Sequence, residues 1–433
     1  MRLEKLLIRT LREAPESAET LGHQFSVRGG YVHQTGAGVY TISPLGLRVL
    51  KNIETIMGRE MNKLGCQEVL MPVVSPASLW IESNRYDSVD ALLKFKTRGG
   101  INSVLNPTHE EIICDYVRSF LQSYRQLPFA LYQMQTKYRD ELRVRAGLIR
   151  CREFIMKDAY SFHSSDGSLE EFYGEMLKAY HLIYKKVGLV DIIEVVAPVG
   201  DMGGRVSHEF QMISPMGEDK IYICASCEYK CNSEALENSG GNGENVLCPK
   251  CGKKLREARG VEIGNIFQLG TKYSESMSVF YSDETGGRRN PVMGCYGIGI
   301  SRTMASIMEQ RLAADANGAV WNMLVAPYRV HIMTIGNSEN IMLTSSKIYH
   351  GLCSLGIDTI LDDGEEGAGS KFANSDLIAA PIVVIISNRC LSMGNVELKY
   401  GNVKGDYPTS IPVADICEKL GQFIENELAL LER

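Results

Sequence analysis

The spacing of apolar residues changes at Pro327, and this change constrains the fold more than any other feature of the chain. After this proline, apolar runs at residues 330–335, 359–361 and 382–386 alternate with helical patterns at 341–355 and around 374–378. Strands that alternate with helices in this way are typical of a compact α/β domain with largely parallel pairing. At 433 residues the chain is also too long for one ordinary domain. We therefore expect one domain over residues 1–326 and a second over 327–433.

Composition and charge exclude several classes of protein. The composition, 44% hydrophobic and 23% charged, is that of a globular enzyme, and the formal charge of −6 argues against binding nucleic acid through bulk charge. Any RNA contact must come from local basic patches, and we expect neither DNA nor a membrane as a partner. The longest apolar run, at residues 377–386, contains a proline and is shorter than the roughly 20 residues of a membrane span. Twelve cysteines without an export signal indicate reduced thiols and a cytoplasmic protein.

Local signals predict several elements of the first domain. Ser43 and Pro44 form an N-cap and a first helical position, the apolar residues that follow recur at helical spacing, and Gly65 can end that helix. A short strand at 68–71 should stop at Pro72, and a strand at 131–138 should pair antiparallel with 151–158. A strand at 292–300 should lead into a helix that Ser301 caps and that runs through 309. The glycine-rich stretch at 238–243 predicts a flexible loop.

The loop between the two antiparallel strands is rich in arginine. Arg139, Arg143, Arg145, Arg150 and Arg152 lie within fourteen residues. Guanidinium groups bind phosphate oxygens bidentately, and the nearby ring of Phe154 could stack on a base. Polyphosphate binding is one interpretation of this cluster, and a solvated basic surface is the other.

A second segment with a chemical signal is the strand at 292–300. Gly294, Gly297 and Gly299 allow a ligand to approach its backbone closely, and Arg302 enters the first turn of the next helix. The glycine spacing fits neither a P-loop nor a dinucleotide-binding motif. Tight packing of strand against helix explains the glycines equally well.

Two Cys-x-x-Cys pairs, Cys224 with Cys227 and Cys248 with Cys251, have the spacing of a zinc ribbon. Four thiolates can present a tetrahedral site for a structural Zn²⁺, and a reducing compartment disfavours disulfides. Cys231 is a fifth candidate, and a degenerate remnant of a zinc site is the alternative.

These segments together resemble, in order, motifs 1, 2 and 3 of class II aminoacyl-tRNA synthetases. Six short stretches of the sequence are similar to those of the bacterial prolyl-tRNA synthetase family: NPTHEE at 106–111, KYRDE at 137–141, REFIMKDAYSFH at 152–163, SHEFQ at 207–211, IFQLGTKYS at 266–274 and GCYGIGISR at 294–302. The resemblance implies an α/β chain overall. An α+β catalytic domain with an antiparallel sheet covers 1–326, a short Cys-rich insertion interrupts it at 212–262, and an anticodon-binding domain covers 327–433.

The resemblance also implies roles for single residues. The catalytic residues are Arg139, Glu141 and Arg302, of which the arginines hold the α- and γ-phosphates of ATP. The remaining ATP-binding residues are Arg150, Phe154, Glu209 and Gln211, with Mg²⁺ accompanying the nucleotide. The proline-binding residues are Thr108, Glu110, Arg139, His163 and Cys295.

Each of these residues has an ordinary structural alternative. His163 could be a satisfied core histidine, Glu110 and Glu209 could be surface carboxylates, and Cys295 could be a small buried apolar residue. For the whole chain, one alternative is a catalytically silent synthetase-like protein that only binds RNA or a regulator. Another is a zinc-ribbon nucleic-acid module carried on a scaffold.

The family resemblance implies an enzyme that activates L-proline with ATP and transfers it to tRNA(Pro), and it implies a homodimer. The second domain departs from the family pattern at Gly364 and Tyr400, where a basic residue is expected. The insertion of about fifty residues is too short for a hydrolytic domain, so we expect no editing of alanyl-tRNA within this chain.

Overall fold

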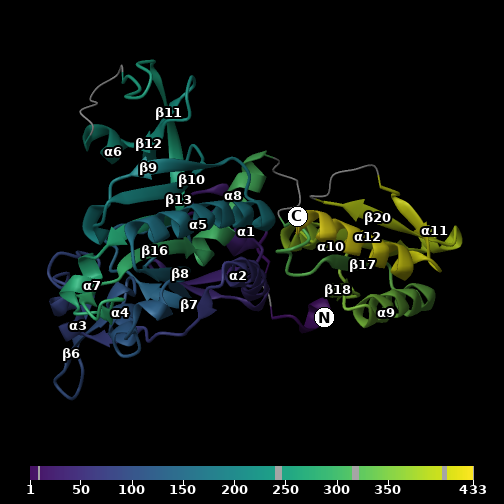
Figure 1. Ribbon diagram of the computed structural model, residues 1–433. Helices are drawn as coiled ribbons and strands as arrows, with labels where there is room; N and C mark the ends of the chain where they lie inside the picture. Colours follow the sequence, from purple (N-terminus) through teal and green to yellow (C-terminus); the bar gives the residue numbers. More distant parts are fainter. Residues whose placement is uncertain (8–9, 239–245, 315–320, 402–406, 433) are drawn as a thin grey trace.

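The computed structural model describes residues 1–7, 10–238, 246–314, 321–401 and 407–432. Residues 239–243 of the expected glycine-rich loop lie outside these ranges. Figure 1 shows two bodies side by side, each built on its own β-sheet. The larger one contains most of the first 326 residues, and the smaller one contains the rest.

The larger body is organised around a nine-stranded sheet. Its strand order is β10 (Val206–Ile213), β9 (Ile192–Ala197), β12 (Lys230–Asn232), β11 (Asp219–Cys224), β13 (Leu255–Gly270), β16 (Val292–Gly299), β8 (Glu153–His163), β7 (Phe129–Tyr138) and β3 (Gln67–Glu68). The pairings are antiparallel except for β3 with β7 and β12 with β9. The expected antiparallel sheet is therefore confirmed.

Three long helices cover one face of this sheet: α2 (Pro44–Lys63), α5 (Asp166–Val187) and α8 (Ile300–Ala314). Shorter helices complete the body: α1 (Leu21–Arg28), α3 (Ala77–Glu82), α4 (Glu110–Arg118), α6 (Ser233–Asn238) and α7 (Lys272–Ser276). The 3₁₀ turns are η1 (Leu3–Lys5), η2 (Tyr124–Gln126) and η3 (Gly200–Met202). The small sheets are β1 (Val32–Gly36) with β2 (Val39–Ile42); β4 (Val74–Pro76), β6 (Asn102–Leu105) and β5 (Leu93–Lys96); and β14 (Tyr281–Ser282) with β15 (Arg288–Arg289).

Helix α2 forms as its sequence predicts. The Ser43 hydroxyl accepts a hydrogen bond from the Gly46 amide, and Pro44 occupies the first helical position. The apolar face, which includes Leu50, Ile53 and Met57, is fully buried against α5 and α8.

The smaller body has five strands in the order β18 (Thr359–Asp362), β17 (Val330–Ile335), β19 (Ile382–Ser387), β20 (Asn395–Tyr400) and β21 (Ser410–Pro412). The first three are parallel, as the alternation after Pro327 predicts, and the last two are antiparallel. Its helices are α9 (Glu339–Ser354), α10 (Ala368–Ile378), α11 (Asn388–Ser392) and α12 (Ile416–Leu431).

Several local expectations differ from the structure. Helix α8 begins at Ile300, two residues before the position that a cap at Ser301 implies, and the Ser301 hydroxyl accepts from the Ile155 amide of β8 instead of capping the helix. Strand β3 covers only Gln67–Glu68 instead of 68–71, although the Val69 amide still donates to the Tyr132 carbonyl of β7. Within the expected insertion at 212–262, β11, β12 and the first part of β13 pair with strands of the large sheet.

The N-terminal residues cross to the smaller body, which sequence patterns do not indicate. Arg2 forms a parallel bridge with Leu361 of β18, and the Leu361 amide donates to the Met1 carbonyl. The two bodies also meet at Tyr31, a fully buried residue before β1. Its hydroxyl lies 3.2 Å and 2.9 Å from the carbonyls of Leu377 and Ile378 and accepts from the Trp321 indole at 2.8 Å.

Tyr31→Phe should therefore lower the free energy of unfolding by about 1–3 kcal/mol, because it leaves a buried indole N–H and buried carbonyls without their partner. Chemical denaturation measures this loss. Tyr116→Phe, at an exposed tyrosine of α4, is the control and should change stability little. Equal stability of the Tyr31→Phe and wild-type proteins would contradict this role of the hydroxyl.

Candidate active site

A cavity of about 350 Å³ opens on the face of the large sheet opposite α2, α5 and α8. Alternate residues of β8 point into it, namely Phe154, Met156 and Asp158, while the residues between them face the helices. Residues that are distant in the sequence complete its wall: Arg85, Thr108, Arg139, Glu141, Met202, Glu262, Asn265, Phe267, Cys295, Gly297 and Arg302. A second cavity of about 220 Å³ shares Arg139, Glu141, Glu262 and Arg302 with it.

Two of the predicted arginines meet in this cavity. Arg139 follows β7 directly, and its guanidinium lies over the Phe154 ring at 5.2 Å. Arg302 lies in the first turn of α8, where its Nε donates to the Ile149 carbonyl at 2.7 Å and its Nη1 to the Glu262 carbonyl at 2.6 Å. Burial, and then the positive charge of Arg302, lower the pKa of Arg139. An anion bound between the two groups would remove this electrostatic cost.

The other predicted residues of the arginine loop pair with one another at the mouth of the second cavity. The Glu141 carboxylate accepts from Arg150 Nε at 3.2 Å and Nη2 at 3.0 Å. Arg150 Nη1 donates in turn to Glu218, which follows β10, at 2.8 Å. Arg143 is exposed and lines neither cavity.

Thr108 and Cys295, two of the predicted proline-binding residues, also line this cavity, and the predicted Glu110 contacts both of them without lining it. Glu110 begins α4 and is fully buried. The Thr108 hydroxyl donates to its Oε2 at 2.6 Å, and the Cys295 thiol donates to its Oε1 at 2.9 Å. Burial, and then the charge of Glu110, raise the pKa of Cys295 well above its usual range, so this thiol is a neutral donor.

Sequence reasoning missed Arg85, which holds this group in place. Arg85 is 3% exposed and lies 2.9 Å from Glu111 and 3.6 Å from Glu110. Its guanidinium also packs on the rings of Trp80 and Tyr273, at 5.1 Å and 5.4 Å. No pattern in the sequence marks Arg85, because it comes from the segment after α3 and reaches α4 only in the folded chain.

Asp158 was also missed, although it lies within the quoted segment 152–163. It forms an ion pair with Lys137 at 2.7 Å and accepts from Gln133 at 2.9 Å and Tyr160 at 2.8 Å. Burial opposes its ionisation, but Lys137 and His109 hold its pKa below the usual value. This buried carboxylate therefore supports the floor of the cavity.

His163, expected in the proline pocket, does not line the cavity. It belongs to the alternate set of β8 residues that faces α5, where its Nδ1 lies 2.9 Å from the Ser168 hydroxyl. Its ring packs on Phe172 at 5.6 Å, and burial lowers its pKa to about 4. In this structure His163 is a neutral core histidine.

A carboxylate group lies beside the arginine pair. Glu209 of β10 and Glu262 of β13 interact as like charges, and Gln211 Nε2 bridges Glu209 to Asp219 at 2.9 Å and 3.0 Å. Burial, and then Glu262, raise the pKa of Glu209 to about 8. Oxygen ligands are those that Mg²⁺ prefers, and a divalent cation here would let these carboxylates ionise together. Sequence analysis identified Glu209 and Gln211 as site residues but missed Glu262. The one feature of the sequence that could have marked Glu262 is its position two residues before Gly264 on the same strand.

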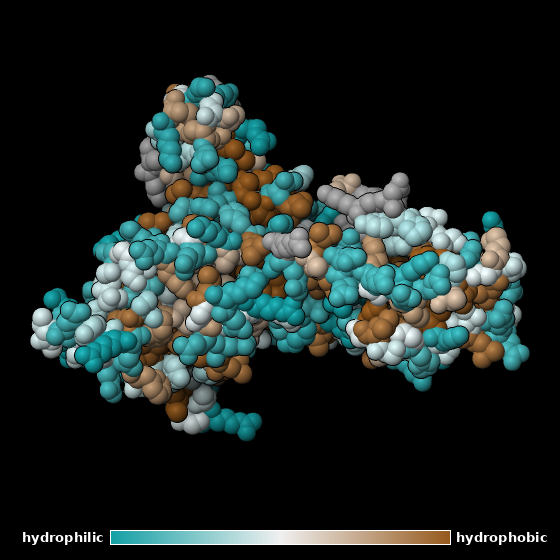
Figure 2. Space-filling view, turned by 45° about the vertical axis from the view of Figure 1, so that its right-hand side comes forward, coloured by the Kyte–Doolittle hydropathy of each residue, from teal (hydrophilic) through white to brown (hydrophobic). Residues whose placement is uncertain are grey.

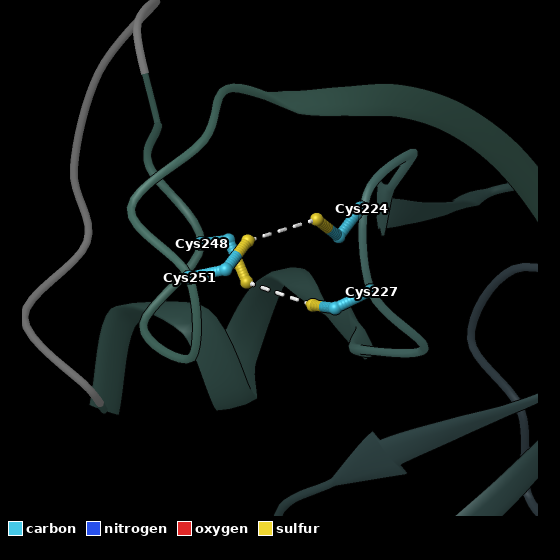
Figure 3. A group of neighbouring side chains, drawn as sticks. All are labelled: Cys224, Cys227, Cys248 and Cys251. Atoms are coloured by element: carbon cyan, nitrogen blue, oxygen red, sulfur yellow. Dashed lines mark hydrogen bonds between the residues drawn. The ribbon is translucent and has the colours of Figure 1, made fainter.

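The structure brings the four predicted cysteines together at the tip of the insertion, as Figure 3 shows. Their Sγ atoms all lie within 4.8 Å of one another. Cys231 does not belong to this group and is buried on β12.

Comparison with known proteins defines the class. Residues 93–311 match the model of the tRNA synthetase class II core domain (G, H, P, S and T), and residues 329–421 match the anticodon-binding domain. A prolyl-tRNA synthetase structure from Giardia lamblia in complex with prolyl-adenylate superposes with a TM-score of 0.76 at 19% identity, over 96% of this chain and 82% of that one. A second such structure, from Cryptosporidium parvum with halofuginone and AMPPNP, gives 0.74 at 18% identity, over 95% and 78%. The fold is that of a class II aminoacyl-tRNA synthetase.

Curated relatives narrow this class to one family. The proline–tRNA ligase of Ehrlichia ruminantium is 39% identical over 415 residues, which cover 93% of this chain and 96% of the relative. That of Thermotoga maritima is 33% identical over 545 aligned residues, covering 92% and 94%. The chain belongs to the proline–tRNA ligase family. Among the described residues, no helix is both long and apolar enough to cross a membrane.

Proposed function

We propose that this chain activates L-proline with ATP and transfers the prolyl group to tRNA(Pro). The observation that carries this proposal is one cavity lined both by the Arg139–Arg302 pair and by Thr108 and Cys295, which hydrogen-bond to the buried Glu110. The arginine pair suits a triphosphate, and the carboxylate with its two donors suits a small substrate with a charged secondary amine. Membership of the proline–tRNA ligase family supports the same assignment.

In the first step, a carboxylate oxygen of proline attacks the α-phosphorus, and the bond from phosphorus to the bridging oxygen breaks to release pyrophosphate. Arg139 holds the α-phosphate and Arg302 the γ-phosphate, so that charge in the transition state is neutralised by groups already oriented. Phe154 stacks on the adenine, and Glu141, held by Arg150, accepts from its amino group. Glu209 and Glu262, with Gln211 beside them, would hold a Mg²⁺ ion that accompanies ATP, and this ion would supply further positive charge at the phosphates.

In the second step, the terminal ribose hydroxyl of the tRNA attacks the prolyl carbonyl, and AMP leaves. The body over residues 327–433 is proposed to bind the anticodon, while residues 1–326, interrupted at 212–262, carry both reactions.

Two rival proposals remain testable: a silent RNA-binding paralogue and a zinc-ribbon nucleic-acid module. Proline-dependent pyrophosphate exchange separates the ligase from both.

Gly364 and Tyr400 lie in the proposed anticodon-binding body. Gly364 lies two residues after the end of β18, and Tyr400 ends β20, where its ring packs on Tyr407 and Phe423 at 5.2 Å and 5.4 Å. Neither position carries the positive charge of the family pattern.

Arg139→Ala and Arg302→Ala should each reduce proline-dependent ATP–pyrophosphate exchange on the order of a hundredfold, because each removes about 3 kcal/mol of charge stabilisation. Circular dichroism should show an intact fold. Arg143→Ala is the matched control, since this exposed arginine of the same loop lines neither cavity. Near-wild-type exchange in either test variant would overturn its role.

Glu110→Gln should raise the KM for proline by tenfold to a hundredfold, roughly the value of a charge-assisted hydrogen bond, while the KM for ATP changes little. Steady-state exchange kinetics with each substrate varied in turn measures this split. Glu284→Gln, at an exposed carboxylate, should change neither constant. A similar rise in both constants would contradict the assignment.

We also propose a homodimer in the cytoplasm. Strand β3 is the outer strand of the large sheet, and Leu70, Tyr116 and Phe120 are exposed beside it, with Leu70 at 77%. A sheet edge flanked by exposed apolar side chains suits a second copy of the same chain. This is the region that contains motif 1.

Phe120→Asp should convert the dimer into a monomer, because it places a charge in this apolar surface. Light scattering after size-exclusion chromatography measures the mass. Leu343→Asp, at an exposed leucine of α9, should leave a dimer. A monomeric wild-type chain at micromolar concentration would overturn the proposal.

Editing is proposed to be absent from this chain. The described part of the insertion contributes β11, β12, α6 and the start of β13 to the sheet and to the cysteine group. The alignment with the Thermotoga relative extends over 545 residues, more than the 433 of this chain, so that relative contains residues that this chain lacks. A pocket shaped for proline cannot exclude the smaller alanine, and the missing contacts discriminate only about 10–200-fold.

The purified enzyme should therefore activate alanine detectably and leave alanyl-tRNA(Pro) uncleared. Incubation with pre-formed alanyl-tRNA(Pro) tests this directly, with a no-enzyme sample as the control. Deacylation well above the control rate would mean that this chain edits after all.

A further inference from the structure

The cysteine group at the tip of the insertion has the geometry of a tetrahedral metal site. Two Sγ–Sγ distances, Cys224 to Cys251 and Cys227 to Cys248, are both 3.5 Å, and all four atoms lie within 4.8 Å of one another (Figure 3). Four sulfurs about 2.3 Å from a central Zn²⁺ are about 3.8 Å apart. A disulfide would need about 2.05 Å. The distances therefore suit one metal ion shared by four thiolates.

The backbone around the cysteines forms the two tight turns that such a site requires. In the first turn, the Cys224 amide donates to the Tyr229 carbonyl at 3.0 Å, and the Ser226 amide points at Cys224 Sγ at 3.4 Å. In the second, the Cys248 amide donates to the Lys253 carbonyl at 2.7 Å. Gly252 has a φ of +72°, which a side chain would disfavour.

The tip has too small a core to fold by apolar burial alone. Its buried residues are Cys224, Cys231, Leu236, Val246, Cys248 and Leu255. Figure 1 and Figure 2 show this part projecting from the body that contains the large sheet. Small modules of this kind need a metal or a covalent link for stability, and four converging thiols provide the ligands for a metal.

One residue connects the tip to the proposed Mg²⁺–ATP site. Asn232 ends β12, five residues after Cys227, and its Oδ1 accepts from the Ala235 amide at the start of α6 at 2.9 Å. This bond turns the amide nitrogen toward Glu209, where Nδ2 lies 3.3 Å and 3.2 Å from the two carboxylate oxygens. The fold of the tip thus fixes the orientation of Glu209.

We propose that Cys224, Cys227, Cys248 and Cys251 bind one structural Zn²⁺, and that the tip it stabilises acts through Asn232 as a positioning element for Glu209. The zinc takes no part in the reaction. The effect on Glu209 rests on the proposed function of that residue, whereas the metal site does not.

Metal analysis of the purified full chain tests the site. After expression in zinc-supplemented medium, we expect about one equivalent of zinc per chain, and Co²⁺ in its place should show thiolate-to-cobalt charge-transfer absorption. Cys251→Ser should remove the zinc and lower the melting temperature. Cys353→Ser, at an exposed cysteine of α9, should leave both the zinc content and the melting temperature unchanged. Less than a tenth of an equivalent in the wild-type chain would overturn the metal site.

Asn232→Ser tests the positioning role without removing a ligand. Serine can still cap α6 but cannot reach Glu209. We expect an unchanged zinc content, an unchanged KM for proline and an increase of about tenfold in the Mg²⁺ concentration that half-saturates pyrophosphate exchange. Unchanged Mg²⁺ dependence would overturn the positioning role.

The two parts fail separately. A wild-type chain with zinc but without proline-dependent exchange would contradict the proposed function and leave the metal site standing. Active wild-type enzyme without zinc would contradict the metal site and leave the proposed function standing.

Discussion

The antiparallel pairing of β8 with β7 and β16 is the interaction on which the site depends. It sets Tyr132 opposite Ala159 and Cys295 opposite Tyr160, so alternate side chains of three strands fall on one face. A shift of one residue would exchange the cavity-lining set of β8 with the set that packs on the helices. The register is specified because Lys157, Ala159 and Ser161 of the second set are fully buried.

The charged groups at the cavity lose hydration when the chain folds, and buried partners of opposite charge reduce this electrostatic penalty. Asp158, which lines the cavity, forms an ion pair with the buried Lys137, and Arg85 lies against Glu110 and Glu111. An unpaired charge at such a buried position would strongly destabilise the fold. The two members of each pair are therefore needed together. Arg139 and Glu209 differ, because their pKa values are shifted in the directions that disfavour ionisation. Groups held in this way are typical of sites that bind charged ligands.

The insertion shows how a short segment can join an existing sheet. Strand β11 pairs with the first part of β13, and β12 adds between β11 and β9. These strands form their hydrogen bonds within the large sheet. Only the tip around the four cysteines needs a stabilising interaction of its own. Asn232 lies at the point where the tip meets the sheet, which explains why its contacts reach the carboxylate group.

Local chemistry in the sequence determined much of this protein. The cap at Ser43, the spacing along α2, the parallel core after Pro327 and the order of the three motif segments all follow from short-range patterns, and so does the cysteine spacing. Tertiary structure alone decided three other matters. It recruited Arg85 and Glu262, it turned His163 toward α5, and it excluded Cys231 from the cysteine group. These outcomes depend on strand parity and on contacts between distant segments, and a linear pattern contains no information on which distant partners will meet.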